Sequence, residues 1–186
     1  MTVRRVLILG HSFIRRLREY IGRNADLDAN LHILEGIELK WHGVGGRTVL
    51  KTVQYDLSVV EKFMPDIVIL QLGTNDLSHL PAVNVGSAIE DLTRSLHDSL
   101  NVKCVCVCQT IYRTGAPTFN KNVILLNRYL KVVLEPIPYA MFWSHKGFWR
   151  AKTNFMARDG IHLNGLGHYK LYRSLRGAVL RCLQSL

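Results

Sequence analysis

The sequence predicts an α/β protein built on a parallel β-sheet with helices covering both faces. Apolar runs of strand length alternate with stretches of helical periodicity along the whole 186-residue chain. The runs are apolar at nearly every position, as in Asp66–Leu72 (DIVILQL), which is the clearest strand. Strands buried on both faces have this composition, and they occur in parallel sheets whose crossover helices lie on either side.

The element boundaries follow from local signals. A strand is predicted where the apolar run is short and rich in β-branched residues, and a helix ends at a glycine or before a proline. The predicted strands are Val3–Leu9, Leu31–Trp41, Asp66–Leu72, Val102–Cys108 and Tyr139–Trp143. The predicted helices are Phe13–Gly22, Val49–Phe63, Val85–Leu100, Asn120–Leu134 and Asn164–Leu183.

The chain is predicted to form one domain over residues 1–186, because it shows neither a linker nor an internal repeat. Its longest stretch without a predicted element is Ser144–Leu163, and loops of this length inside compact domains tend to be functional. No apolar run approaches the ~18 residues of a membrane span. The run Val6–Leu9 is too short for the core of a signal peptide, so we expect a cytoplasmic protein.

The cysteines are expected to be buried, reduced thiols. Cys104, Cys106 and Cys108 alternate along one predicted strand, so their side chains should share one face. Neighbours along a strand are poorly placed to form a disulfide, and the spacing lacks the two-residue gap typical of zinc sites. A metal cluster remains as the less favoured alternative.

The formal net charge of +10 suits an anionic partner. The cations gather near the first predicted helix (Arg15, Arg16, Arg18, Arg23) and on the last (Lys170, Arg173, Arg176, Arg181). A solvated surface is the simpler interpretation, and no nucleic-acid-binding motif accompanies the charge.

Polar, glycine-rich segments follow several predicted strands, at the edge of the sheet where parallel α/β proteins bind their ligands. They are Gly10-His11-Ser12, Gly43–Thr48, Gly73–Asp76 and, on the long loop after the last strand, Asp159–His162. Each segment alone is weak evidence. Together they describe a site.

Ser12 opens a predicted helix, where it has two interpretations. It could simply cap the helix, as serine often does. The same position also sets its hydroxyl at the positive end of the helix dipole, which favours a developing alkoxide. Asp159 could likewise be only a turn residue, and His162 only a partly buried structural one. Alternatively, the carboxylate reaches the near ring nitrogen of His162 and leaves the far nitrogen free to take a serine proton.

The remaining segments could supply donors to an oxyanion. Gly43, Gly45 and Gly46 could form a tight turn, or their unobstructed backbone N–H groups could face a reacting oxygen. Asn75 and Asp76 could cap a helical turn, or the Asn75 amide could donate to the oxyanion. A dinucleotide cofactor is disfavoured, because the G-x-G-x-x-G pattern is missing after the first strand.

These segments together resemble the SGNH hydrolases, also called GDSL esterases or lipases. That family carries four blocks in this order, which appear here as Gly10-His11-Ser12, Gly45–Thr48, Gly73-Thr74-Asn75-Asp76 and Asp159-Gly160-Ile161-His162. Their order and spacing agree from Leu7 to the final helix. The stretch GHSFIRRL is also similar to SGNH domains carried by animal retroelements.

The resemblance implies a flavodoxin-like three-layer α/β/α sandwich with a five-stranded parallel sheet of order 2-1-3-4-5. It implies that Ser12 is the nucleophile, His162 the base and Asp159 the group that orients the base. It places the oxyanion donors at the Ser12 amide, the Gly46 amide and the Asn75 side chain, with Gly45 as the alternative to Gly46.

One residue departs from the family pattern, because His11 stands where the family usually has Asp. Adjacent residues on a sharp turn usually diverge, so His11 is not expected to be the base. It could change how the turn is held or lower the activity.

The expected function is hydrolysis of short-chain, acetyl-type esters through an acyl-serine, without metal or organic cofactor. One alternative is a hydrolase-like module with feeble catalysis. The other is an adaptor that binds nucleic acid or another anionic surface through the basic helices. The aromatic residues Trp143, Phe148, Trp149 and Phe155 around the long loop could line an acyl pocket or pack the loop.

Overall fold

A computed structural model of the chain describes residues 3–33, 36–148 and 154–186. Its five strands form one parallel sheet of order β2-β1-β3-β4-β5, which confirms the expected topology. The strands are β1 (Arg4–Gly10), β2 (Ile37–Gly43), β3 (Ile67–Gln71), β4 (Cys104–Cys108) and β5 (Ala140–Trp143). The helices are α1 (Ser12–Gly22), α2 (Val49–Tyr55), α3 (Leu57–Phe63), the short 3-10 helix η1 (Asp76–Ser78), α4 (Ala82–Asp98), α5 (Pro117–Leu134) and α6 (Gly165–Gln184).

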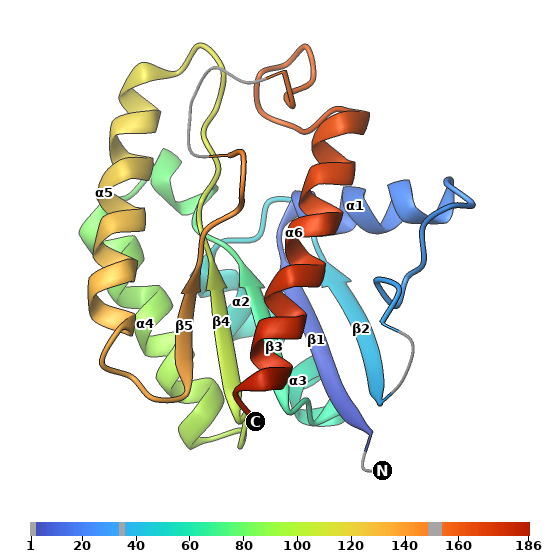
Figure 1. Cartoon of the computed structure of the whole chain (residues 1–186). Helices are drawn as coiled ribbons and strands as arrows, with labels where there is room; N and C mark the ends of the chain where they lie inside the picture. The colour runs from blue at the N-terminus through green and yellow to red at the C-terminus, as the bar shows by residue number, and fades with distance from the viewer. Residues whose placement is uncertain (1–2, 34–35, 149–153) are drawn as a thin grey trace.

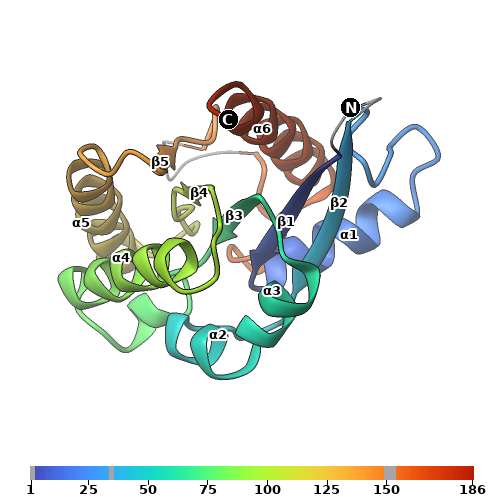
Figure 2. The ribbon, with the colours of Figure 1, turned by 90° about the horizontal axis from the view of Figure 1, so that it is seen from below.

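The helices form a layer on each side of the sheet (Figures 1 and 2). Helices α1 and α6 cover one face, and α2 to α5 cover the other. Each face has its own apolar core, and the alternation along β4 shows the division. Cys104, Cys106 and Cys108 pack on the α1–α6 side, whereas Val105 and Val107 pack on the other. All four cysteines are buried and free, as expected. Among the described residues, every helix is too short or too polar to cross a bilayer.

Strand β2 begins six residues later than predicted. Leu31 and His32 have left-handed backbone angles, with φ of 58° and 50°, so the chain turns there and cannot extend. The carbonyl of Leu31 accepts a hydrogen bond from Arg176 on α6, at 3.0 Å. The alternating pattern in the sequence is therefore shared between a loop packed on α6 and the strand itself.

The single helix predicted over 49–63 is two helices joined at Asp56. The Asp56 backbone closes α2 through a hydrogen bond to the Thr52 carbonyl, and α3 starts at the next residue. The Asp56 side chain, 2% exposed, turns inward to Arg47 and His42. These long-range partners explain a break that the local pattern does not show.

A buried polar network ties the sheet to the loop after β5. The His145 ring contacts Gln71 Oε1 through Nε2 at 2.7 Å and the Ser174 hydroxyl through Nδ1 at 2.8 Å. Because the Gln71 amide NH₂ already donates to the Gln109 carbonyl, its oxygen is the acceptor and His145 carries its proton on Nε2. Burial lowers the pKa of His145 from 6.5 to about 3, so the ring is neutral in the folded protein.

We expect His145 to make the protein sensitive to mild acid. The unfolded chain takes up a proton at a pKa near 6.5, whereas the folded chain does so only near 3. This contribution to stability is therefore complete above pH 6.5 and is lost as the pH falls toward 3. His145→Gln should make the decline of unfolding free energy with falling pH less steep, by at most about 1.4 kcal/mol per pH unit.

Urea denaturation of wild type and His145→Gln at several pH values measures the two slopes. Between about pH 7.5 and pH 8.5 the slopes should coincide, because the imidazole is then neutral in both folded and unfolded chains. Equal slopes below about pH 6 would show that His145 does not act this way.

Candidate active site

The turn after β1 is packed closely against the neighbouring strand. A Cβ atom on Gly10 would lie 2.6 Å from the Gln71 carbonyl oxygen on β3, which leaves room only for glycine. Two residues later, Ser12 is the first residue of α1 and is half-buried. The dense turn thus fixes the start of this helix at the end of β1.

His11, and not Ser12, caps α1. The His11 Nδ1 accepts the Phe13 backbone N–H at 3.4 Å, so the structural interpretation of Ser12 as the N-cap is wrong. Burial, followed by the nearby charges of Arg113 and His162, lowers the pKa of His11 from 6.5 to about 3. In the neutral ring, the Nδ1 lone pair accepts the Phe13 N–H, and the proton is on Nε2. His11 therefore has no free lone pair with which to accept a serine proton.

Asp159 and His162 form a tight pair on the long loop. Asp159 Oδ2 accepts from His162 Nδ1 at 2.7 Å, and Asp159 Oδ1 accepts the backbone N–H groups of Ile161 and His162, each at 2.9 Å. These hydrogen bonds, led by the one from the His162 backbone, hold the pKa of Asp159 well below its usual range. The ionised carboxylate fixes the Nδ1–H tautomer and leaves the His162 Nε2 lone pair free.

The loop that carries this pair is fastened to the rest of the fold. The Thr114 N–H donates to the Gly160 carbonyl at 2.8 Å, and the Ala157 N–H donates to the His162 carbonyl at 2.7 Å. Gly160 has a φ of +69°, and a Cβ there would lie 2.8 Å from the Thr114 carbonyl oxygen. Glycine is needed at this position for both its backbone angle and its close approach.

His162 lies beside the start of α1. Its ring centroid is 6.4 Å from that of Phe13, the residue after Ser12, in an edge-on arrangement. The two imidazoles are also close enough to interact electrostatically, and His162 contributes to the lowered pKa of His11. Within the described part of the chain, no hydrogen bond joins the Ser12 hydroxyl to His162. The fold therefore brings the His162 ring close to the start of α1, but the ring is not hydrogen-bonded to Ser12 in this structure.

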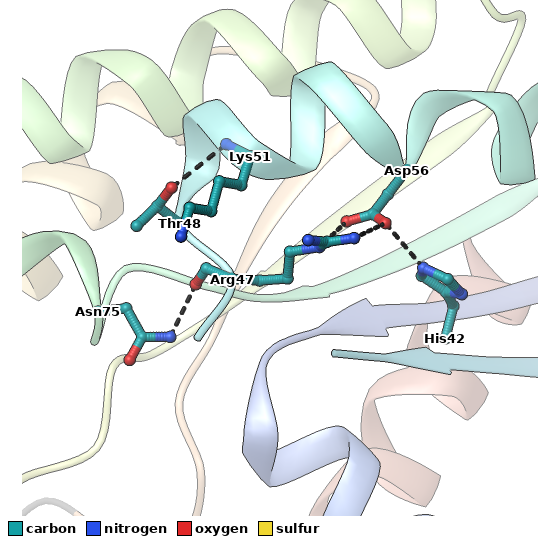
Figure 3. A network of polar contacts seen from close by, with 6 residues as sticks. All are labelled: His42, Arg47, Thr48, Lys51, Asp56 and Asn75. Carbon is teal, nitrogen blue, oxygen red and sulfur yellow. Dashed lines mark hydrogen bonds and ion pairs between the residues drawn. The ribbon is translucent and has the colours of Figure 1, made fainter. Parts of the chain in front are cut away.

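The loops after β2 and β3 are fastened to each other, as Figure 3 shows. The Asn75 side-chain amide donates to the Arg47 carbonyl at 2.8 Å. The Arg47 guanidinium binds the buried Asp56 carboxylate through Nε at 2.8 Å and Nη2 at 3.0 Å, and His42 binds the same carboxylate at 2.9 Å. One carboxylate on the α2–α3 junction thereby anchors the segment next to Gly46.

Asp76 has a structural role that differs from the suggested cap of its own turn. Its Oδ1 accepts the Val49 N–H at the start of α2, at 2.9 Å, while the Thr48 hydroxyl accepts the Lys51 N–H. Burial raises the pKa of Asp76. Neither Asn75 nor Asp76 caps η1 through its side chain, so the Asn75 side chain remains available at the site.

Each of the three expected oxyanion donors keeps a hydrogen that has no acceptor in the described part of the chain. Among the described residues, neither the Ser12 nor the Gly46 backbone N–H donates to a carbonyl. The Asn75 amide donates one of its two hydrogens to the Arg47 carbonyl, and the other has no acceptor among the described residues. Gly46 has a φ of +71°, whereas its alternative Gly45 is not in the left-handed region.

The aromatic residues near the loop have mixed positions. Phe148 is 1% exposed and packs against Phe155, with ring centroids 5.3 Å apart, so it packs the loop. Trp143 donates its indole N–H to Ser174. Trp149 lies outside the described residues. Arg113, which no motif indicated, has its guanidinium against the Thr74 carbonyl in the loop after β3.

Several solved structures have the same fold. A serine-to-alanine variant of an acetyl esterase, solved with an acetate ion, is 17% identical with a TM-score of 0.72, covering 98% of this chain and 99% of that one. A catalytic mutant of Axe2, an acetylxylan esterase from Geobacillus stearothermophilus, is 15% identical with a TM-score of 0.67, and the coverage is 94% of both chains. A GDSL-like lipase from Bacteroides thetaiotaomicron is 15% identical with a TM-score of 0.69, covering 96% of this chain and 88% of that one.

At these identities the structural likeness shows the fold alone, and among curated protein sequences none matches this chain. The sequence match to the GDSL-like lipase/acylhydrolase family spans residues 9–170, which is most of the chain and includes every block of the site. The chain therefore belongs to the GDSL-like lipase/acylhydrolase family and has the SGNH hydrolase fold.

Proposed function

We propose that this protein is a serine ester hydrolase that acts through an acyl-serine intermediate. The observation that carries the proposal is the His162–Asp159 pair, which occupies Nδ1 and leaves Nε2 free. Its imidazole ring centroid lies 6.4 Å from that of Phe13, the residue after Ser12. Family membership supports hydrolase chemistry, and Ser12, His162 and Asp159 are our assignment of nucleophile, base and orienting group.

In the proposed reaction, His162 Nε2 takes the Ser12 proton while Oγ attacks the ester carbonyl. The Ser12 and Gly46 N–H groups and the Asn75 amide stabilise the oxyanion, and His162 then protonates the departing alcohol. A water molecule, deprotonated by His162, next attacks the acyl-serine and releases the acid. Asp159 stays ionised and holds the imidazole in the required tautomer.

The missing hydrogen bond between Ser12 and His162 is compatible with this mechanism. Hydrogen bonds between nucleophile and base are often long in a free enzyme and tighten when substrate binds. The His162 side chain is 23% exposed and that of Asp159 is 46% exposed, so the pair lies at an open rim. An open rim accommodates a small acyl group without further rearrangement of the core.

Acetyl-type esters are the substrates that we favour. Two of the structurally similar proteins are an acetyl esterase and an acetylxylan esterase. Their identity to this chain is too low to transfer a substrate directly, so acyl-chain length has to be measured.

A second candidate function is binding of nucleic acid through the basic face of α6. A surface groove of about 500 Å³ is lined by Lys146, Lys170, Arg173 and two aromatic residues, Trp143 and Tyr169, with Leu166 and Ser174. Cations interleaved with aromatic rings suit phosphates and stacked bases. None of the described residues that line the groove is acidic, so none of them would repel phosphates.

A fluorophosphonate should label the purified protein at Ser12, because labelling needs both an activated hydroxyl and an oxyanion pocket. Ser12→Ala and His162→Ala should each lower kcat for nitrophenyl acetate by about 10³-fold or more. Ser58→Ala, which changes an exposed serine on α3, is the matched control and should retain activity. Hydrolysis that survives in Ser12→Ala would remove the esterase assignment.

Asn75→Ala should lower kcat by about 10²–10³-fold with KM changed by less than about threefold, since the amide contacts the charge that develops in the transition state. Asn84→Ala, on the exposed side of α4, is the control. Thermal unfolding of both variants checks the fold. A rise in KM with constant kcat would place Asn75 in ground-state binding instead.

If the basic groove binds nucleic acid, Lys170→Gln/Arg173→Gln should weaken the affinity for a single-stranded oligonucleotide and reduce its salt dependence. Ser12→Ala should bind as wild type does. Fluorescence anisotropy at several salt concentrations measures both. Equal binding by the double variant and wild type would rule this groove out.

A further inference from the structure

Arg113, in the loop between β4 and α5, holds its guanidinium in a fixed position. The Nη2 atom donates to the Thr74 carbonyl at 3.1 Å and lies 3.4 Å from the Thr74 hydroxyl. The guanidinium carbon lies 3.8 Å from the centre of the Phe119 ring, so the ring supports one face of the group. The Asn120 side chain also holds the Arg113 backbone: its oxygen accepts the Arg113 N–H, and its amide donates to the Arg113 carbonyl.

This fixed position is surrounded by the loops of the proposed active site. Thr74 directly precedes Asn75, and the residue after Arg113, Thr114, donates to the Gly160 carbonyl in the His162 loop. The guanidinium is also close enough to His11, next to Ser12, to lower the pKa of that imidazole. Three segments that are far apart in the sequence therefore meet around one cation.

The charge of Arg113 has no partner in the described part of the chain. No carboxylate lies within 4.0 Å of it, in contrast to Arg47, whose guanidinium binds Asp56 through two nitrogens. The Arg113 Nε is buried and has no acceptor among the described residues, and Nη1 makes no hydrogen bond there either. His11 Nε2, which carries a proton, is a second buried donor without an acceptor among the residues that the structure describes.

Such an arrangement favours an anion from outside the chain. Burial lowers the pKa of Arg113, which means that the cation loses hydration without receiving a counter-charge from the protein. A donor left unsatisfied in this way destabilises the folded protein. The Arg113 side chain is only partly buried, so an outside oxyanion can approach the exposed part of the guanidinium and supply the missing counter-charge. The planar guanidinium also suits carboxylate and phosphate oxygens better than an ammonium group does.

We propose that Arg113 forms an anion subsite beside the nucleophile and selects esters that carry a carboxylate or a phosphate group. The inference rests on the proposed esterase function and deepens it. The anionic group of the substrate would lie toward Thr74, while the ester carbonyl lies at Ser12. The subsite is distinct from the basic surfaces of α1 and α6, because its cation is fixed and partly buried in the loops of the site itself.

Three acetate esters of similar shape test the proposal: 4-acetoxybenzoate, 4-acetoxyphenyl phosphate and the neutral methyl 4-acetoxybenzoate. The measured quantity is kcat/KM for each anionic ester divided by kcat/KM for the neutral one. Arg113→Gln should lower this ratio by about tenfold or more for at least one anion, and comparison of the two anions identifies the preferred group. Arg113→Lys keeps the positive charge but loses the planar guanidinium, so its ratio should lie between those of wild type and Arg113→Gln.

Lys121→Gln is the matched control, because it removes one positive charge from an exposed position on α5 near the same loop. Its ratio should stay within about twofold of wild type, since exposed charges are screened by salt. A ratio that Arg113→Gln leaves unchanged, or that falls equally in Lys121→Gln, overturns the subsite. Circular dichroism and thermal unfolding show whether each variant is folded.

Binding without turnover separates this inference from the esterase proposal. Titration of 4-acetoxybenzoate into Ser12→Ala should shift backbone amide resonances of residues 73–75 and 113–114, and Ser12→Ala/Arg113→Gln should lose the shifts. If wild type hydrolyses no ester but this Arg113-dependent binding is present, the esterase function fails and the anion subsite stands. If the neutral ester is hydrolysed in a Ser12-dependent way but the anion does not bind, the subsite fails alone.

Discussion

The parallel pairing of β1 with both of its neighbours is the constraint on which the site depends. In this register Gly10 lies opposite Gly43 on β2 and Gln71 on β3. Three strands therefore end at the same level, and the segments bearing Ser12, Gly46 and Asn75 leave the sheet side by side. A Cβ at Gly43 would lie 2.2 Å from the backbone nitrogen of Arg15, so α1 also packs directly against the end of β2. This close packing leaves the start of α1 no freedom to move away from the neighbouring loops.

Residues outside the reaction hold the loops that rise from this edge. Asp56 binds Arg47, Asp76 receives the first N–H of α2, and Thr114 holds Gly160. Each anchor uses groups that the proposed chemistry does not need. The Ser12 and Gly46 amides, one Asn75 hydrogen and His162 Nε2 are left without internal partners within the described residues. Preorganised donors of this kind stabilise developing charge without rearranging during the reaction.

The groups near Ser12 differ in charge and in burial. The ionised Asp159 carboxylate supports His162, and both side chains are partly exposed to solvent. His11 is a buried, neutral imidazole, and Arg113 is a partly buried cation. His11 replaces the usual acidic residue of the family with a group that still caps α1 but brings no negative charge. Among the described residues no carboxylate lies within 4.0 Å of the Arg113 guanidinium, so its charge stays available for the proposed anion.

Local sequence determined the strands and most of the helices, because apolar periodicity and glycine or proline breaks depend on neighbours within a few residues. It also identified the four family motifs that carry the candidate site residues. The Asp159–His162 contact could also be predicted from the sequence, because a turn of three residues brings the two side chains together. Tertiary structure decided the rest. It moved the start of β2, split the helix at Asp56, gave the cap of α1 to His11 and set Arg113 among the three loops of the proposed active site. The partners that decide three of these cases come from other elements of the fold: Arg176 for β2, Arg47 and His42 for Asp56, and Thr74 for Arg113. The His11 cap is a local contact with Phe13, which the residue type alone does not indicate.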